Sequence, residues 1–194
     1  GILGLMGPST RAAAMMATAD IETDGGILGR PIVVRTVDAG RAPTQVLRDI
    51  RRAAPDGMPD LLVGTHPSYL REYLARRIEG RFAYVYTPYY EGDERRSGIY
   101  PIGETPDSQL RPPFGLIIRR TGVKRWYVIG HDYVWPRQAG RTAGAAIADA
   151  GGSVVGEHYV SLRRSSFADD LRAIAATGAE GVACFLIGQG AIDF

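Results

Sequence analysis

The chain of 194 residues is poor in cysteine, in lysine and in long apolar runs, and each shortage excludes a class of protein. Its single cysteine, Cys184, lies within an apolar segment, so no disulfide framework can form inside one chain, and we interpret it as a small core residue. No apolar run is long enough to span a bilayer, and no signal peptide is visible. Because the chain begins inside an apolar segment, the lack of a leader does not assign a compartment.

The sequence also has no large excess of positive or negative charge. The 23 basic and 21 acidic residues nearly balance, which leaves a formal net charge of +2. Lys124 is the only lysine, and the arginine pairs are scattered along the chain instead of gathering in one tail. We interpret most of these arginines as solvated helix faces, so the sequence does not predict a nucleic-acid-binding protein.

Motifs for metal, nucleotide and nucleophilic chemistry are missing as well. The three histidines lack metal-ligand spacing, and we find neither a Walker loop nor a Gly-x-Ser-x-Gly elbow. The glycines of residues 25–29 follow a helix and precede a strand, whereas a dinucleotide loop needs the reverse order. We therefore expect no metal, no cofactor and no enzymatic activity. His131 beside Asp132 leaves acid–base chemistry as the remaining enzymatic alternative.

What the sequence does contain is an alternation of apolar strands with amphipathic helices, which predicts an α/β fold with parallel sheets covered on both faces. Residues 11–22, rich in alanine and methionine, indicate a buried helix. In the helix expected at 109–120, Pro112 and Pro113 should be tolerated only in the first turn, so the helix should begin at their turn or later. Residues 2–6 are typical of the end of a strand. The expected strands are 32–37, a short buried one at 60–64, 82–87, 124–129, 152–160 and 181–187, and the expected helices are 11–22, 43–54, 68–78, 109–120, 136–150 and 167–176.

This alternation pauses near residues 101–108 in an irregular segment that contains proline, and a new series of strands and helices follows. We therefore predict two lobes, at residues 1–104 and 105–194, each incomplete in this chain.

Two aromatic clusters follow predicted strands, one at residues 86–92 and one at residues 131–135. In open parallel sheets, ligands bind outside the carboxyl ends of the strands, so these clusters predict the two sides of a cleft for a small polar ligand. Glu91 and Asp132 would meet a ligand amine or amide N–H group, although Glu91 could instead only brace its loop. Trp135 could instead pack under the following helix.

Two predicted helix starts offer further ligand contacts. The turn at residues 64–68 brings hydroxyl groups and free backbone amides to a helix N-terminus, where they could bind a carboxylate or carbonyl oxygen, or where Ser68 could simply cap the helix. A second helix start, at residues 7–10, offers the same kind of contact through its backbone and Ser9.

Three segments resemble those of type I periplasmic substrate-binding proteins. The first is the Gly-Pro-Ser turn with its alanine-rich helix and the segment DGGILGRP at residues 24–31, and the others are YYEG at 89–92 and IGHDYVWPR at 129–137. The last two look like the branch that binds amides and urea, which includes a cytoplasmic amide sensor regulating an aliphatic amidase operon. The resemblance implies a two-lobed fold in which the polypeptide crosses repeatedly from one lobe to the other, and this chain contains the first of those crossings. Later strands and some ligand contacts would then lie outside it.

The resemblance also implies ligand-binding positions. In the first lobe, the turn after the family's third strand matches Thr65, His66 and Ser68. The tyrosine that ends the family's fourth strand matches Tyr86. Tyr89 stands where amide sensors have a hydroxyl contact, so that contact is either lost or taken over by Thr87. Residues 188–190 would form the last cleft loop of this chain. The complete predicted set is Ser9, Thr65, His66, Ser68, Tyr86, Thr87, Tyr89, Tyr133, Trp135 and Gln189.

The sequence thus leaves two functions open. The first is the substrate-binding component of an ABC-type importer for an amide, urea or an amino acid, membrane-anchored in the periplasm or outside the cell, with transporter membrane subunits as partners. The second is a cytoplasmic sensor that acts through a regulatory protein. In both, the lobes close on the ligand by a hinge movement, and a homo-oligomer is compatible with either.

Overall fold

Parallel strands in two separate sheets form the framework of the chain. The computed structural model describes residues 3–54 and 56–194. Within them, six strands make two sheets of three, in the orders β1-β2-β3 and β5-β4-β6, and every pairing is parallel. The strands are β1 Leu61–Gly64, β2 Ala83–Tyr86, β3 Ile99–Pro101, β4 Arg125–His131, β5 Ser153–Val160 and β6 Gly181–Phe185. The predicted α/β class with parallel sheets is confirmed.

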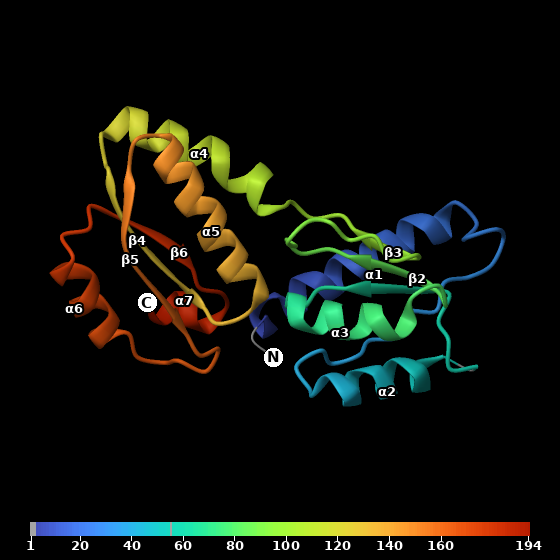
Figure 1. Ribbon diagram of the computed structural model, residues 1–194. Helices are drawn as coiled ribbons and strands as arrows, with labels where there is room; N and C mark the ends of the chain where they lie inside the picture. The colour runs from blue at the N-terminus through green and yellow to red at the C-terminus, as the bar shows by residue number, and fades with distance from the viewer. Residues whose placement is uncertain (1–2, 55) are drawn as a thin grey trace.

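The helices cover these sheets in two halves that lie side by side (Figure 1). In the N-terminal half, α1 to β3, helices α2 and α3 lie together beside the first sheet. In the C-terminal half, α4 to α7, helices α4 and α5 lie on one side of the second sheet and α6 on the other. The helices are α1 Gly7–Thr23, α2 Pro43–Ala53, α3 Ser68–Ile78, α4 Pro106–Thr121, α5 Val134–Asp149, α6 Ala168–Ala176 and α7 Gln189–Asp193. Among the described residues, no helix has both the length and the apolar character that crossing a membrane requires.

The core of the N-terminal half lies between its sheet and the apolar faces of α2 and α3. Helix α2 buries Val46, Leu47 and Ile50, whose spacing of three to four residues places them on one face of a helix. They pack in one cluster with buried residues of α3 and with Tyr84 and Tyr86 of β2. The alternation of aromatic and small residues in β2 therefore points both tyrosines into the core.

The second sheet is covered on both faces, as the alternation along β4 shows. Trp126 and Val128 belong to a core with α4 and α5, whereas Tyr127 and Ile129 belong to a separate core that includes Phe167 and α6. A strand with buried residues on both faces is typical of the centre of a parallel sheet.

The N-terminal segment differs from the prediction. Residues 4–6 form a 3₁₀ turn instead of the end of a strand, and the first two residues lie outside the described part of the chain. Helix α1 begins at Gly7, so the predicted turn is its first turn, and none of its described residues is buried. Met15 and Met16 are 63% and 68% exposed, so the prediction of a buried helix is wrong. Alanine and methionine favour a helix wherever it lies, and they do not require burial.

The segment at 32–37 shows a second difference, because it forms no strand among the described residues. A strand needs a neighbour to satisfy its backbone groups, and this segment has none in the first sheet. Val33 and Val34 are exposed, as are Leu61 and Val63 of β1, so the prediction that residues 60–64 form a buried strand is also wrong. Strand β1 is exposed because it lies at the edge of its sheet.

Helix α4 also departs from expectation, because it runs from Pro106 to Thr121 with Pro112 and Pro113 inside it. Both prolines lie on the exposed face, where carbonyl groups that lose a backbone donor can reach water. Thr105 and Ser108 form a capping box that fixes the helix start before the prolines. The residues after Gly188, expected to be a loop, form the short helix α7. Cys184 of β6 is exposed, so the interpretation of this cysteine as a core residue is wrong.

The connection between the halves passes closely over the loop that follows β2. Tyr90 N–H donates to Glu104 O at 3.1 Å, and Ile102 N–H donates to Tyr86 O at 3.0 Å. Gly103 lies between these bonds, where a Cβ atom would collide with the backbone carbonyl of Pro88. Only glycine permits this approach, so the connection and the loop at 88–92 are packed as one unit.

Candidate functional site

The carboxyl ends of β1 and β2 lie side by side, because Gly64 pairs with Tyr86 in the register of the two strands. The following residues, Thr65 and Thr87, therefore meet, and their hydroxyl oxygens are 2.8 Å apart. Thr87 Oγ1 also donates to the carbonyl of Gly64 at 3.3 Å, which makes Thr65 the donor between the two hydroxyls. The lone pairs of Thr65 Oγ1 remain available as acceptors at this edge.

His66 is buried in the turn after β1 and organises it. Its Nε2 lies 2.9 Å from the hydroxyl of Tyr84, and its Nδ1 lies 3.2 Å from the carbonyl of Pro67. Burial lowers the pKa of His66 from 6.5 to about 4, so the ring is neutral at neutral pH. Tyr86 Oη donates to the carbonyl of His66 at 2.7 Å, which ties the end of β2 to this turn.

Ser68 lies at the start of α3 with 1% of its surface exposed. Pro67 occupies the N-cap position, and no side chain caps this helix, so the alternative in which Ser68 is the cap is wrong. Burial raises the pKa of the Tyr86 hydroxyl to about 12, and a hydrogen bond with Ser68 partly offsets that rise. Ser68 therefore contacts Tyr86 at the end of β2.

Two aromatic contacts join the halves, and each includes at least one residue of the clusters predicted from the sequence. Tyr89 stacks on Trp135 with ring centroids 5.9 Å apart and planes inclined by 21°. Tyr69 of α3 meets Tyr133 edge to face, at 6.2 Å and 87°. Aromatic pairs favour both geometries, so the two clusters lie against each other in this arrangement.

Trp135 and Tyr133 differ in how deeply their side chains are buried in the C-terminal half. Trp135 is 9% exposed and also packs edge to face on Phe185, so it belongs to the core as well as to the contact with Tyr89. Its indole N–H donates to no acceptor among the described residues. Tyr133 is half-buried at the N-cap of α5, and burial raises the pKa of its hydroxyl, to which the nearby charge of Glu91 adds.

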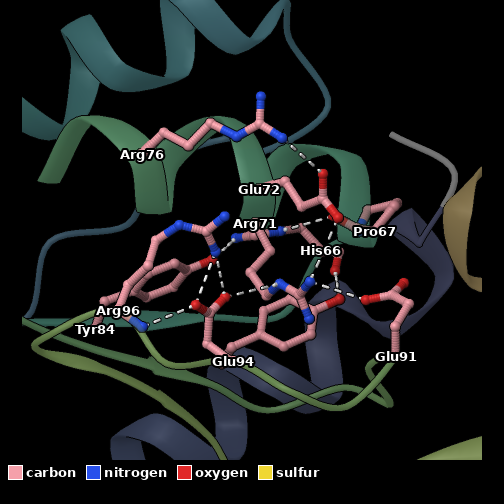
Figure 2. A network of polar contacts seen from close by, with 10 residues as sticks. His66, Pro67, Arg71, Glu72, Arg76, Tyr84, Glu91, Glu94 and Arg96 are labelled. Carbon is pink, nitrogen blue, oxygen red and sulfur yellow. Dashed lines mark hydrogen bonds and ion pairs between the residues drawn. The ribbon is translucent and has the colours of Figure 1, made fainter. Parts of the chain in front are cut away.

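A buried ion-pair network, which sequence reasoning missed, lies directly behind this edge (Figure 2). Arg71 of α3 is 4% exposed, and its Nη2 lies 2.8 Å from Glu91 Oε2. Its Nε lies 3.9 Å from Glu94 Oε2, and Glu94 accepts two bonds of 2.7 Å from Arg96. The guanidinium also lies over the rings of Tyr86 and Tyr90, 5.4 and 5.7 Å from their centroids.

The spacing of α3 contains the signal that could have identified Arg71. Leu74, Ala75 and Ile78 form the buried stripe of this helix, and Arg71 lies three to four residues before the first two of them. A charged residue within an apolar stripe predicts a buried charge that needs a partner. The sequence does not show which carboxylates supply it, because Glu91 and Glu94 come from a loop after the next strand.

The other predicted residues lie apart from these contacts or point elsewhere. Ser9 is exposed and donates to Met6 O at 3.0 Å, while Gln189 donates to Asp193 within α7 at 2.8 Å. His131 is fully buried, and its Nδ1 accepts the N–H of Ile187 at 3.1 Å. Asp132 is exposed and pairs with Arg137 at 2.6 Å, so these two neighbours do not form an acid–base pair.

Solved structures of solute-binding proteins share this fold at low sequence identity. The fatty acid ABC transporter substrate-binding protein of Thermomonospora curvata superposes with a TM-score of 0.84 at 16% identity, covering 100% of this chain and 50% of that one. A solute binding protein of an ABC transporter from R. palustris, in complex with 4-hydroxybenzoate, gives 0.77 at 18% identity, covering 100% and 53%. The leucine-, isoleucine-, valine-, threonine- and alanine-binding protein of Brucella ovis, in its closed conformation, gives 0.72 at 17% identity, covering 95% and 50%.

The chain therefore spans about half the length of these solved proteins, and the likeness establishes the fold. A family described as periplasmic binding protein matches residues 1–194. That family consists of solute-binding proteins and not of enzymes, which agrees with the sequence prediction. Because the match extends over the whole sequence, this chain belongs to the periplasmic binding protein family, and its two parallel sheets have the type I fold.

Proposed function

We propose that the chain forms a cleft for a small polar ligand of the amide, urea or amino acid class, within the substrate-binding component of an ABC-type importer. The observation that carries this proposal is the meeting of polar aromatic side chains from the two halves, Tyr69 with Tyr133 and Tyr89 with Trp135. Flat rings with hydrogen-bonding edges suit a small polar molecule. Two of the solved relatives named above are ABC transporter proteins and the third is an amino acid-binding protein, which supports the same proposal.

In this proposal the halves are lobes, with residues 1–104 and 105–194, that close on the ligand by a hinge movement. Thr65, Tyr86 and Thr87 hold the ligand on the first lobe, and Tyr133 and Trp135 approach from the second. The protein would act outside the cytoplasmic membrane and deliver its ligand to transporter membrane subunits. The relatives reported above give no support to the sensor alternative.

Calorimetric titration tests the ligand class directly. The panel is urea, acetamide, L-leucine and benzoate, added to the longest natural form of the protein that contains these residues. We expect saturable binding of at least one of the first three solutes. If none of these three binds, the proposed ligand class is wrong.

Replacement of Tyr133 by alanine should weaken binding of that ligand at least tenfold, or about 1.4 kcal/mol, because the cleft loses a ring and a hydroxyl from the second lobe. The matched control is Tyr100→Ala, which removes a tyrosine that is 54% exposed on β3 and should leave affinity unchanged. Equal dissociation constants for the Tyr133→Ala variant and the unchanged protein would exclude Tyr133 from ligand binding.

A further inference from the structure

A groove lies between helix α5 and strand β5, which forms one edge of the second sheet. It encloses about 430 Å³ and is lined by Gly140, Arg141 and Gly144 of α5, by residues 154–157 of β5 and by Val128 of β4. None of these residues belongs to the aromatic clusters at 86–92 and 131–135. This α5–β5 groove is therefore a feature of the second half alone, separate from the proposed cleft.

Small residues keep the helix side of the groove shallow. Gly140 has no room for a side chain, because a Cβ atom there would lie 2.0 Å from Tyr159 Oη. Gly144 has room, because a Cβ atom there would meet only Val154, at an ordinary contact distance of 3.7 Å. Ala145 and Ala148 are exposed on the same helix. Side chains of a partner could therefore approach the backbone of α5 closely.

Two exposed side chains of opposite charge line the groove, Arg141 from α5 and Glu157 from β5. Glu157 pairs with Val128 in the register of β4 and β5, so it lies on the face of the sheet that α5 covers. Arg141 donates to Gln138 Oε1 at 2.6 Å. Neither charge forms an ion pair with another of the residues that the structure describes. Both are therefore available to a partner.

Two features of the groove disfavour other kinds of occupant. Since both charged side chains are exposed, a small molecule between them would stay largely in water, whereas ligand pockets bury most of their ligand. The register of β4 against β5 shifts after Val154, which leaves a bulge at Val155. A bulge interrupts the regular row of backbone groups that an added strand would need. Side-chain packing against another protein surface is the contact that remains.

We propose that the α5–β5 groove is the contact surface of a symmetric dimer, in which Arg141 of each copy of the chain pairs with Glu157 of the other. A surface that carries both members of an ion pair is complementary to itself, because a two-fold axis brings each member opposite the other. The dimer also buries Ala145, Ala148 and Val154, which is 36% exposed in the single chain. The ion pairs then fix the register of two apolar surfaces. This inference goes beyond the proposed function and does not depend on the ligand.

Sedimentation equilibrium of the longest natural form of the protein that contains these residues tests the proposal. We expect the mass of two copies, falling toward one copy on dilution. Arg141→Glu and Glu157→Arg should each raise the dissociation constant of the dimer by about tenfold or more, because each places like charges together at two points of the interface. The matched control is Arg172→Glu on α6, on the opposite side of the sheet, where the side chain is 74% exposed. This control should leave the dissociation constant unchanged.

Mixing the two reversed variants provides the decisive measurement. Each supplies the charge that the other lacks, so an equimolar mixture should dimerise as the unchanged protein does, although neither variant does so alone. Gly144→Gln should also prevent dimerisation, because its side chain fills the groove, and thermal unfolding shows whether each variant is folded. A single-copy mass of the unchanged protein at every concentration overturns the proposal. So does a dimer that folded Arg141→Glu and Glu157→Arg variants do not weaken, or a mixture that fails to recover it, while the proposed function stands.

Discussion

Replacement of Arg71 by methionine should lower the free energy of unfolding by about 3–5 kcal/mol, because it leaves the buried carboxylate of Glu91 without its cation. Methionine fills much of the same space, so the expected loss comes from the unpaired charge and not from a cavity. Glu94 keeps its two bonds to Arg96, which limits the effect to one carboxylate. Thermal denaturation followed by circular dichroism measures the change.

The matched control is Arg76→Met on the same helix, where the side chain is 64% exposed and lies 3.5 Å from Glu72. Exposed pairs of this kind contribute little, so the control should change stability by less than about 0.5 kcal/mol. The double variant Arg71→Met with Glu91→Gln should recover part of the loss, because it removes the orphaned charge as well. Equal losses in Arg71→Met and Arg76→Met would show that the network does not stabilise the fold.

Acid should destabilise the protein through His66. The pKa of its ring is 6.5 when unfolded and about 4 in the fold, so between these pH values the unfolded chain binds a proton that the folded chain does not. Protons therefore favour unfolding, and stability falls as the pH drops from neutral toward 4. The contribution of this residue reaches about 3 kcal/mol, since each pKa unit corresponds to about 1.36 kcal/mol.

The measurement is the free energy of unfolding at pH 7.5 and at pH 4 for the unchanged protein and for His66→Gln. Glutamine can accept the bond from Tyr84 but cannot titrate, and the carboxylates that titrate in this range are common to both proteins. We expect the variant to lose less stability between these two pH values. If both proteins lost the same amount, proton uptake at His66 would not explain the acid sensitivity.

The elements that could be predicted from the sequence are those whose burial follows a local repeat. Val46, Leu47 and Ile50 mark one face of α2, and the alternation around Tyr84 and Tyr86 marks β2. The segment at 32–37 has the composition of a strand but no neighbouring strand, and pairing with a neighbour is not a local property. For the same reason, the exposure of α1 could not be predicted from its alanines and methionines.

The candidate site also has residues that could be predicted from the sequence and residues that could not. The aromatic clusters at 86–92 and 131–135 could be found because each follows a strand, and the structure brings Tyr89 against Trp135. The pairing of Arg71 with Glu91 could not, because it joins a helix to a loop beyond the next strand. Residue types at one position indicate that a buried charge needs a partner, but the fold decides which residue supplies it.

The stack between Tyr89 and Trp135 also supplies an optical signal with which the proposed hinge movement can be tested. The chain has two tryptophans, and the other, Trp126, lies in the core between β4 and α4. A Trp126→Phe variant would leave Trp135 as the single tryptophan, and the ring of Tyr89 from the opposite half shields its indole. Separation of the halves would expose that indole to water, so its fluorescence emission should shift to longer wavelength on opening. Ligand-driven closure could then be followed in stopped-flow experiments without any attached dye.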